Sequence, residues 1–315
     1  MSTDSLSPSW KTLEIPDHAK AGIISIGNFD GVHLGHRSLI NQMQSLGNEH
    51  QAPIVPITFF PHPLLQLKPN IKLNFLSTIE QKKKLLNSEG VAFVAVLKTD
   101  DGLLDLSAED FFEKIIVRKF KAKGIIEGPD FQFGKGRNGT MALLQQLCLA
   151  NNILFHTAQP MLLGNTLISS SKIRNAIQTG DLQAAKSLLG RFYSIEGSVV
   201  TGAKRGRTIG FPTANLENIQ TILPANGVYA GLCKIGAKTF TTALNIGPNP
   251  TFAETLQKVE AHLLDFEGDL YNQCLEILFI EKIRDTKAFL NKEELVNQIQ
   301  FDISKIREIT SHFKN

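Results

Sequence analysis

The hydrophobic pattern of this chain changes near residue 190, from one that is typical of a mixed α/β fold to one that is typical of a β fold. From residue 21 to about 157, short β-branched runs alternate with helical patterns, as they do in a parallel sheet covered by helices. After Gly190, strand-like runs follow one another through Gly, Pro and Asn turns, which predicts an antiparallel sheet or small barrel. We therefore expect two domains, residues 1–187 and 188–315.

The first domain is predicted to be an α/β, Rossmann-like fold with a parallel sheet. Its candidate strands are residues 22–26, 54–60, 91–97, 124–127 and 153–156, and its candidate helices are residues 35–48, 78–89, 107–120 and 139–151. Ser107, with Asp110 three residues on, forms a capping-box pattern that starts the third helix. Residues 169–189 predict two short helices, because Gly180 can end one and Asp181 can cap the next.

The second domain is predicted to be a β-barrel with a terminal helix. Its candidate strands are residues 193–201, 228–234, 239–245, 259–266 and 275–283. Asn291 then caps a final helix. An apolar stripe on that helix should lie against the barrel. The stripe consists of Val296, Ile299, Ile303 and Ile306.

Composition excludes several functional classes. Residues 1–186 carry nineteen Lys and Arg against sixteen Asp and Glu, and the remainder carries fourteen of each, so neither part has the basic excess of a nonspecific nucleic-acid binder. The longest apolar run, 91–97, is far shorter than the roughly 18 residues of a membrane span, and the first twenty residues lack a secretory core. Three widely spaced cysteines suit buried thiols in a reducing cytosol. We expect a cytoplasmic protein without nucleic-acid or membrane partners; a homo-oligomer is left open.

Two segments of the first domain carry phosphate-binding patterns. Residues 27–36, GNFDGVHLGH, follow the first predicted strand and open the first helix, where amides and the helix dipole favour a phosphate. His33 and His36 can both point there, and Gly35 lets a ligand approach. Residues 168–174, ISSSKIR, place three hydroxyls before a helix and two cations in its first turn. Singly, each pattern is more often ordinary polar chemistry or a helix cap, but their conjunction favours function.

Together these patterns resemble the nucleotidyltransferases that hold ATP with H-x-G-H and I-S-S-T-x-x-R. With residues 29–31 included, they are similar to the adenylyltransferase module of the bacterial bifunctional riboflavin kinase/FMN adenylyltransferase (FAD synthetase) family. Residues 58–63 and 128–134 match that family's T-F-x-P-H-P and G-x-D-F-x-F-G segments. The resemblance implies adenylylation of FMN to FAD with release of pyrophosphate, and it makes His33 and His36 catalytic hydrogen-bond donors.

The resemblance also implies a set of ligand contacts in the first domain. The ATP-binding residues are Gly27, Asn28, Phe29, Asp30, Gly35, Ser169, Ser170, Ser171, Lys172 and Arg174. The flavin-binding residues are His62, Asp130, Phe131 and Phe133, and for the two phenylalanines a packing role is equally expected. Two departures stand out: Ser171 replaces a Thr but keeps the hydroxyl, and residues 72–74, Lys-Leu-Asn, replace R-L-T and lose a guanidinium that Lys does not match.

A second chemical pattern lies in residues 200–216, VTGAKRGRTIGFPTANL. Between the flanking strands, residues 202–213 hold three glycines, three cations and two hydroxyls, a loop that can cradle phosphates, although such a loop is as often a solvated hairpin. Thr213 and Asn215 favour the phosphate site, because two neutral oxygen ligands on one strand face can hold Mg²⁺ together with nucleotide phosphates.

Residues 210–215, GFPTAN, closely match the motif of riboflavin kinases, and the match continues through 227–230, 245–252 and 259–266. The resemblance implies a six-stranded-type barrel in which Glu260 is the general base for the ribityl hydroxyl. It places Thr213 and Asn215 at the metal. Its ATP-binding residues are Gly202, Lys204, Arg207, Gly210, Thr213 and Asn215, and its flavin-binding residues are Asn249, Thr251, Phe252 and Arg284.

The residues alone give a blander role for Glu260. It would be a charged side chain on the solvent face of an alternating strand, and the alternation supports an inward direction only weakly.

We therefore expect a bifunctional enzyme whose substrates are riboflavin, FMN and ATP, with Mg²⁺ as cofactor and FMN and FAD as products. Three alternatives stay open at this point. One of the two activities is absent; or the barrel senses flavin or binds RNA, against which its zero net charge argues; or the first domain adenylylates another phosphate-bearing acceptor.

Overall fold

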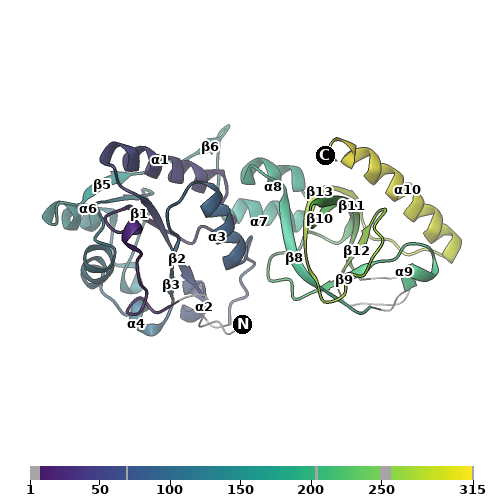
Figure 1. Ribbon diagram of the computed structural model, residues 1–315, viewed down its shortest axis with the longest axis horizontal. Helices are drawn as coiled ribbons and strands as arrows, with labels where there is room; N and C mark the ends of the chain where they lie inside the picture. Colours follow the sequence, from purple (N-terminus) through teal and green to yellow (C-terminus); the bar gives the residue numbers. More distant parts are fainter. Residues whose placement is uncertain (1–7, 69, 203–204, 249–256, 314–315) are drawn as a thin grey trace. The chain divides into compact units, whose positions relative to one another are not determined.

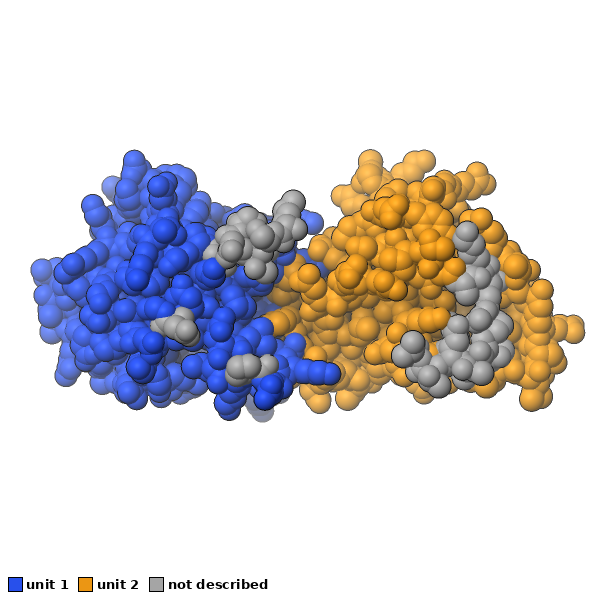
Figure 2. Space-filling model, turned by 90° about the horizontal axis from the view of Figure 1, so that it is seen from below, with its two compact units in different colours: residues 1–73, 79–168 blue, residues 74–78, 169–315 orange. Residues whose placement is uncertain are grey.

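The computed structural model describes residues 8–68, 70–202, 205–248 and 257–313. The chain divides into two compact units, coloured separately in Figure 2. Unit 1 comprises residues 1–73 and 79–168, and unit 2 comprises residues 74–78 and 169–315.

Unit 1 is built on a parallel sheet (Figure 1). Its strands, in spatial order, are β3 (Ala95–Lys98), β2 (Ile54–Phe60), β1 (Ile23–Ile26), β4 (Gly124–Glu127) and β5 (Leu154–Thr157). Because β2 and β4 flank β1 on opposite sides, the strand order reverses between β1 and β4. In sheets of this kind, ligands bind at that point, beyond the carboxyl ends of the strands.

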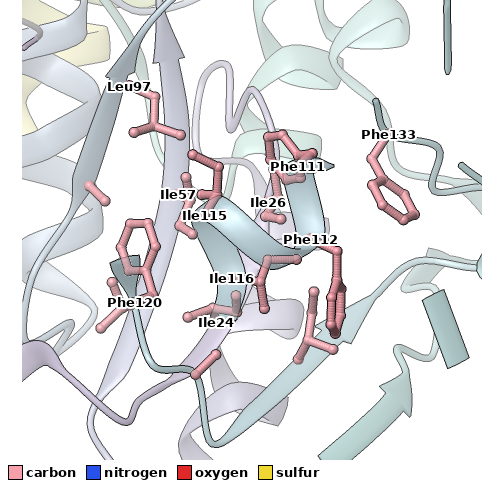
Figure 3. Packing of buried hydrophobic residues seen from close by; sticks show 14 of the residues in the cluster. Ile24, Ile26, Ile57, Leu97, Phe111, Phe112, Ile115, Ile116, Phe120 and Phe133 are labelled. Atoms are coloured by element: carbon pink, nitrogen blue, oxygen red, sulfur yellow. The ribbon is translucent and has the colours of Figure 1, made fainter. Parts of the chain in front are cut away.

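Helices cover both faces of this sheet. The first face packs against α1 (Leu34–His50) and α3 (Ile79–Ser88). The second face packs against α5 (Ala108–Phe111), its continuation as the π-helix η3 (Phe112–Lys119), and α6 (Met141–Ala150). Successive residues of β1 alternate between these cores, with Ile23 in the first and Ile24 in the second. Figure 3 shows the second core.

The smaller elements of unit 1 are η2 (Asp17–Ala19), α2 (Pro63–Leu67), α4 (Asp101–Leu104), η4 (Lys135–Arg137), β6 (Leu162–Leu163) and β7 (Thr166–Leu167).

Unit 2 contains the expected closed barrel, preceded and followed by helices. The strands, in spatial order, are β10 (Gly227–Ile235), β11 (Lys238–Gly247), β12 (Lys258–Leu263), β9 (Ala214–Glu217), β8 (Tyr193–Val200) and β13 (Cys274–Arg284). The helices are α7 (Ser170–Thr179), α8 (Leu182–Leu189), α9 (Arg205–Thr208), α10 (Lys292–Thr310) and η6 (Ser311–Phe313).

The predicted helix ends of residues 107–120 and 169–189 are confirmed by their caps. Ser107 Oγ accepts the amide hydrogen of Asp110 at 3.0 Å. Gly180 ends α7 in the left-handed conformation, and Asp181 caps α8. Helix α8 packs against the barrel, where the Gln183 side chain donates to the backbone of β13.

Three strand predictions differ from the structure. The predicted strand 259–266 already ends at Leu263, as β12. The predicted strand 91–97 begins only at Ala95, which pairs with Ile57 on β2. The residue before Ala95 would have to pair with Pro56, which has no amide hydrogen to donate to a neighbouring strand. The barrel's sixth strand, β9, is missing from the strands read from the hydrophobic pattern, because four residues are too few for a clear alternation; six strands were implied only by the resemblance.

The apolar stripe predicted for the last helix is only partly correct. Ile306 is fully buried against β10 and β13, but Asp302 and Thr310 are buried on the same helix. Their burial is explained by partners that lie far away in sequence. Asp302 receives the Arg284 guanidinium, and the Thr310 hydroxyl lies 3.0 Å from that of Thr241.

Candidate active sites

The loop between β1 and α1 holds the two predicted catalytic histidines in a defined arrangement. His33 is the N-cap of α1, and its Nδ1 accepts the His36 amide hydrogen at 3.3 Å. Since Nδ1 is an acceptor, the proton of the neutral ring is on Nε2, which can donate to a phosphate. The two imidazoles stack with centroids 3.7 Å apart. The cap occupies one helix amide and leaves those of Leu34 and Gly35 for a ligand.

Gly35 lies close against the His33 ring. A Cβ at this position would lie 3.1 Å from Nδ1 and Cε1 of His33, closer than ordinary packing allows. Gly35 was expected from the sequence to admit a ligand. The structure gives glycine a second role here, which is to leave space for the His33 ring.

Two other residues of this loop are buried. Phe29 is 2% exposed, lies with its ring centroid 5.3 Å from that of His36, and adopts a positive φ. Asp30 is 3% exposed. An ATP contact by either residue stays a prediction, whereas the structure gives Phe29 a packing role.

Buried polar side chains that were not predicted from the sequence also hold the β1–α1 loop and the end of β1 by hydrogen bonds. Thr58 donates from Oγ1 to the Asn28 carbonyl oxygen at 3.2 Å, and Lys82 Nζ donates to the same Oγ1 at 3.4 Å. On the other side of β1, Glu127 accepts the amide hydrogen of Ile26 at 2.6 Å. A lysine in an amphipathic helix carries no sign of burial, so only Glu127, at the end of an apolar strand, could have been noticed.

Burial strongly raises the pKa of Glu127, against the lowering effect of the bonds from Ile26 and Ser25. Folding therefore favours the protonated carboxyl more than the unfolded chain does, so the free energy of unfolding falls as pH rises through the ordinary pKa of a glutamate. Glutamine at position 127 can keep both hydrogen bonds without this dependence on pH. We therefore expect Glu127→Gln to be more stable than wild type at pH 7, with a free energy of unfolding higher by about 1 kcal/mol or more. Urea titrations at pH 4 and pH 7 measure the difference in unfolding free energy between Glu127→Gln and wild type, which should be smaller at pH 4. The same difference at both pH values would contradict the prediction. Glu80→Gln, at an exposed position, is the control.

The predicted flavin contacts of unit 1 have diverse surroundings. His62 caps α2, and Asp130 is exposed. Phe131 and Phe133 stack with centroids 5.7 Å apart, and Phe133 is 6% exposed in the second core (Figure 3). Phe133 thus packs the domain, and its flavin contact, like those of the other three, stays a prediction.

The predicted serine–cation segment opens α7 in unit 2. Ser169 is its N-cap and accepts the Lys172 amide hydrogen at 3.5 Å, while Ser171 and Lys172 are exposed. Arg174 donates from Nε to the Asn74 carbonyl oxygen at 2.7 Å. Since this acceptor is backbone, the contact does not depend on the side chain at position 74. ATP contacts by these residues and by Ser170 stay predictions.

In the barrel, strand register brings the predicted kinase residues together. Glu260 on β12 pairs directly with Asn215 on β9 and, on its other side, with Asn245 on β11. Directly paired residues share one face of a sheet, with Cβ atoms about 5 Å apart. Asn245 was part of the matched motif but was not predicted as a site residue. Its position follows from register, which the sequence does not reveal.

Glu260 lies on the outer face of the barrel. Val259, Ala261 and Leu263 alternate with it and are buried, whereas Glu260 and His262 are half-buried. His262 Nδ1 donates to the Pro212 carbonyl oxygen at 2.7 Å, which ties the GFPTAN segment to β12. The site therefore lies against the barrel wall rather than inside the barrel.

One glycine makes room for a predicted metal ligand, because a Cβ on Gly202 would lie 2.2 Å from Nδ2 of Asn215. Gly206 instead makes room for backbone, because a Cβ there would lie 2.3 Å from the Phe211 carbonyl oxygen, whereas its 3.4 Å distance to Oγ1 of Thr213 is ordinary contact. Neutral oxygens next to a glycine loop suit Mg²⁺ that keeps water and phosphate ligands, so this donor set fits the ion. Gly210 has a φ of +89° and Arg207 is exposed; their ATP contacts stay predictions.

We expect Gly202→Ala to lower kcat/KM for MgATP in riboflavin phosphorylation at least tenfold, because the new methyl group displaces the Asn215 side chain. Steady-state assays of Gly202→Ala, Asn215→Ala and the double variant measure this. The double variant should be no worse than Asn215→Ala alone. Additive losses would show that Gly202 acts through something else.

Four predicted site residues, Lys204, Asn249, Thr251 and Phe252, lie outside the described residues. Arg284 is described, and its guanidinium bonds Asp302 at 2.8–2.9 Å. Its flavin contact stays a prediction beside this ion pair.

Comparisons with known proteins cover both units. A family model described as FAD synthetase matches residues 15–172, and one described as riboflavin kinase matches residues 189–310. The bifunctional riboflavin kinase/FMN adenylyltransferase of Escherichia coli K12 is 36% identical over 91% of this chain and 92% of its own. That of Buchnera aphidicola from Acyrthosiphon pisum is 35% identical over 93% of this chain and 95% of its own.

A solved structure shares the fold. The crystal structure of a macrolide-efflux protein from Streptococcus pneumoniae superposes with a TM-score of 0.85 and 29% identity, covering 95% of this chain and 97% of that one. Within the described parts of this chain, no helix has the length and apolar character needed to cross a membrane. From its two family models and its full-length relatives, the chain belongs to the bifunctional riboflavin kinase/FMN adenylyltransferase family.

Proposed function

We propose that this chain makes FAD from riboflavin in two steps. The barrel transfers the γ-phosphoryl group of ATP to riboflavin, and the N-terminal domain then transfers AMP from a second ATP to FMN. The observation that carries the proposal is the register that aligns Asn215, Glu260 and Asn245 across three neighbouring strands, beside a segment of the riboflavin kinase type. The functional boundary is proposed at residue 187.

In the kinase step, Glu260 takes the proton of the ribityl 5′-hydroxyl. The hydroxyl oxygen forms a bond to the γ-phosphorus of ATP, and ADP leaves. Asn215 and Thr213 would hold Mg²⁺, which when bound neutralises phosphate charge. Gly202 keeps space for the Asn215 side chain, and Gly206 keeps space for the Phe211 carbonyl oxygen, two residues before Thr213. The segment that carries Thr213 is held to β12 by His262, next but one to the base.

In the adenylyltransferase step, an FMN phosphate oxygen bonds the α-phosphorus of ATP and pyrophosphate leaves. No covalent enzyme intermediate is needed, so positioning and charge neutralisation supply the catalysis. His33, through Nε2–H, and His36 donate to the phosphates, with the α1 amides of Leu34 and Gly35. Lys172 and Arg174 neutralise the leaving group. We further propose a cytoplasmic location, Mg²⁺ as the ion for both steps, and no nucleic-acid partner.

Incubation with riboflavin and Mg-ATP, with FMN and FAD resolved over time, tests the proposal. FMN should rise first and FAD should follow. FMN without FAD, even from added FMN, would refute the second activity. FAD from added FMN without turnover of riboflavin would refute the first. EDTA should stop both reactions.

A further inference from the structure

Lys82, on α3, is a lysine that is almost completely buried. It is 8% exposed, and the sequence-based phosphate site does not include it. An ammonium group is costly to bury unless nearby groups favour its charge. A cation kept in such a place therefore calls for an explanation from its neighbours.

The neighbours of Lys82 connect it to the loop between β1 and α1, residues 27–33, which we call the phosphate loop. Nζ donates to Thr58 Oγ1 at 3.4 Å, and that hydroxyl donates to the Asn28 carbonyl oxygen at 3.2 Å. Thr58 is fully buried on β2. Asp30, two residues after Asn28 and 3% exposed, attracts the ammonium electrostatically. Lys82 thus acts on two points of the loop that ends at His33, the N-cap of α1.

We propose that Lys82 is a positioning residue for FMN adenylylation, which holds Asn28 and Asp30 so that the loop presents His33, His36 and the α1 amides to the triphosphate. The inference rests on the proposed adenylyltransferase activity. It assigns no contact with substrate to Lys82, which acts through Thr58 and Asp30.

A pH dependence follows from the burial of the ammonium. Burial lowers the pKa of Lys82 to about 8, and Asp30 opposes this lowering. Within the described part of unit 1, Asp30 is the charged group that acts on Lys82 from the loop, and Thr58, its contact on β2, is neutral. The charge is present below pH 8 and lost above it. Hence kcat/KM for ATP in FAD formation should fall about tenfold per pH unit above 8, since that parameter reports the unliganded enzyme.

The kcat of the same reaction should fall at higher pH than kcat/KM does. A triphosphate beside the loop adds negative charge, which favours the ammonium form and raises its pKa in the complex. A group that only supports folding would not produce this separation between the two profiles.

The test uses the full-length chain, in which riboflavin phosphorylation is an internal control. Lys82→Met should lower kcat/KM for ATP in FAD formation at least tenfold at pH 7 and abolish the alkaline decline, with kinase rates within twofold of wild type. Lys83→Met, the same change one residue on at a half-buried position, should leave both reactions unchanged. Wild-type rates and an unchanged profile in Lys82→Met would overturn the proposal.

Two further measurements apply if Lys82→Met does not fold. Thr58→Val removes the relay, and Thr58→Ser restores it; the proposal requires loss of FAD formation in the first and recovery in the second. The wild-type profile needs no variant, and a flat kcat/KM between pH 7 and 9.5 would overturn the proposal. If wild type forms FMN but no FAD, the proposed adenylyltransferase activity is wrong. If wild type forms FAD and the Lys82 variant forms it equally well, only the role of Lys82 is wrong.

Discussion

Replacement of Glu260 by glutamine is expected to lower kcat for riboflavin phosphorylation at least about a hundredfold, the contribution of a positioned general base. Glutamine keeps the shape of the side chain and its place between Asn215 and Asn245, but it cannot accept the hydroxyl proton. KM for MgATP should change little, because the base acts on the other substrate. Rates of FMN formation from riboflavin at saturating ATP measure the effect.

The control for Glu260 comes from the same barrel and the same chain. Glu217→Gln makes the same chemical change at an exposed position of β9 and should leave the kinase at wild-type rates. FAD formation from added FMN should be unaffected in both variants. A Glu260→Gln enzyme with wild-type kcat would show that Glu260 is only a polar residue on the outer face of the barrel.

The second large effect is expected at His33, where one residue has two separable tasks. Its Nδ1 caps α1, and its Nε2–H is proposed to donate to ATP phosphate. Asparagine is among the best N-caps, so His33→Asn keeps the cap but removes the imidazole, whereas His33→Ala removes both. Both variants should lower kcat/KM for FAD formation about a hundredfold, as loss of one preorganised donor does.

Stability separates the two His33 variants. Since both lose the buried ring, the difference between them isolates the cap, and His33→Ala should be less stable than His33→Asn by about 1 kcal/mol. Urea unfolding followed by circular dichroism measures this difference, and kinase rates should match wild type in both. If His33→Asn formed FAD at the wild-type rate, the ring would serve only as a cap.

The local parts of both sites could be predicted from the sequence. The caps at Ser107, Asp181 and Asn291 depend on short-range pairs of residues and occur as expected. Placement of residues 27–36 between a strand and a helix is equally local. These features could be predicted because a side-chain oxygen bonds an amide only two or three residues away.

What the sequence could not reveal depends on contacts between distant residues. The alternation in residues 258–263 shows two faces but not which face is inside, and the structure places Glu260 outside because Val259 and Ala261 fill the barrel. Asp302 and Thr310 likewise interrupt an apolar stripe because their partners lie outside the helix: Arg284 at the end of the preceding strand β13, and Thr241 on β11.

The type of both domains, the order of their motifs and the helix caps can be read from the sequence, because hydrophobic periodicity and capping act over a few residues. Three features appear only in the folded chain: Asn245 flanks Glu260, Gly202 makes room for Asn215, and Lys82 is buried beneath the loop between β1 and α1. Strand register and the burial of a charge are set by the packing of the whole domain, which no local pattern encodes.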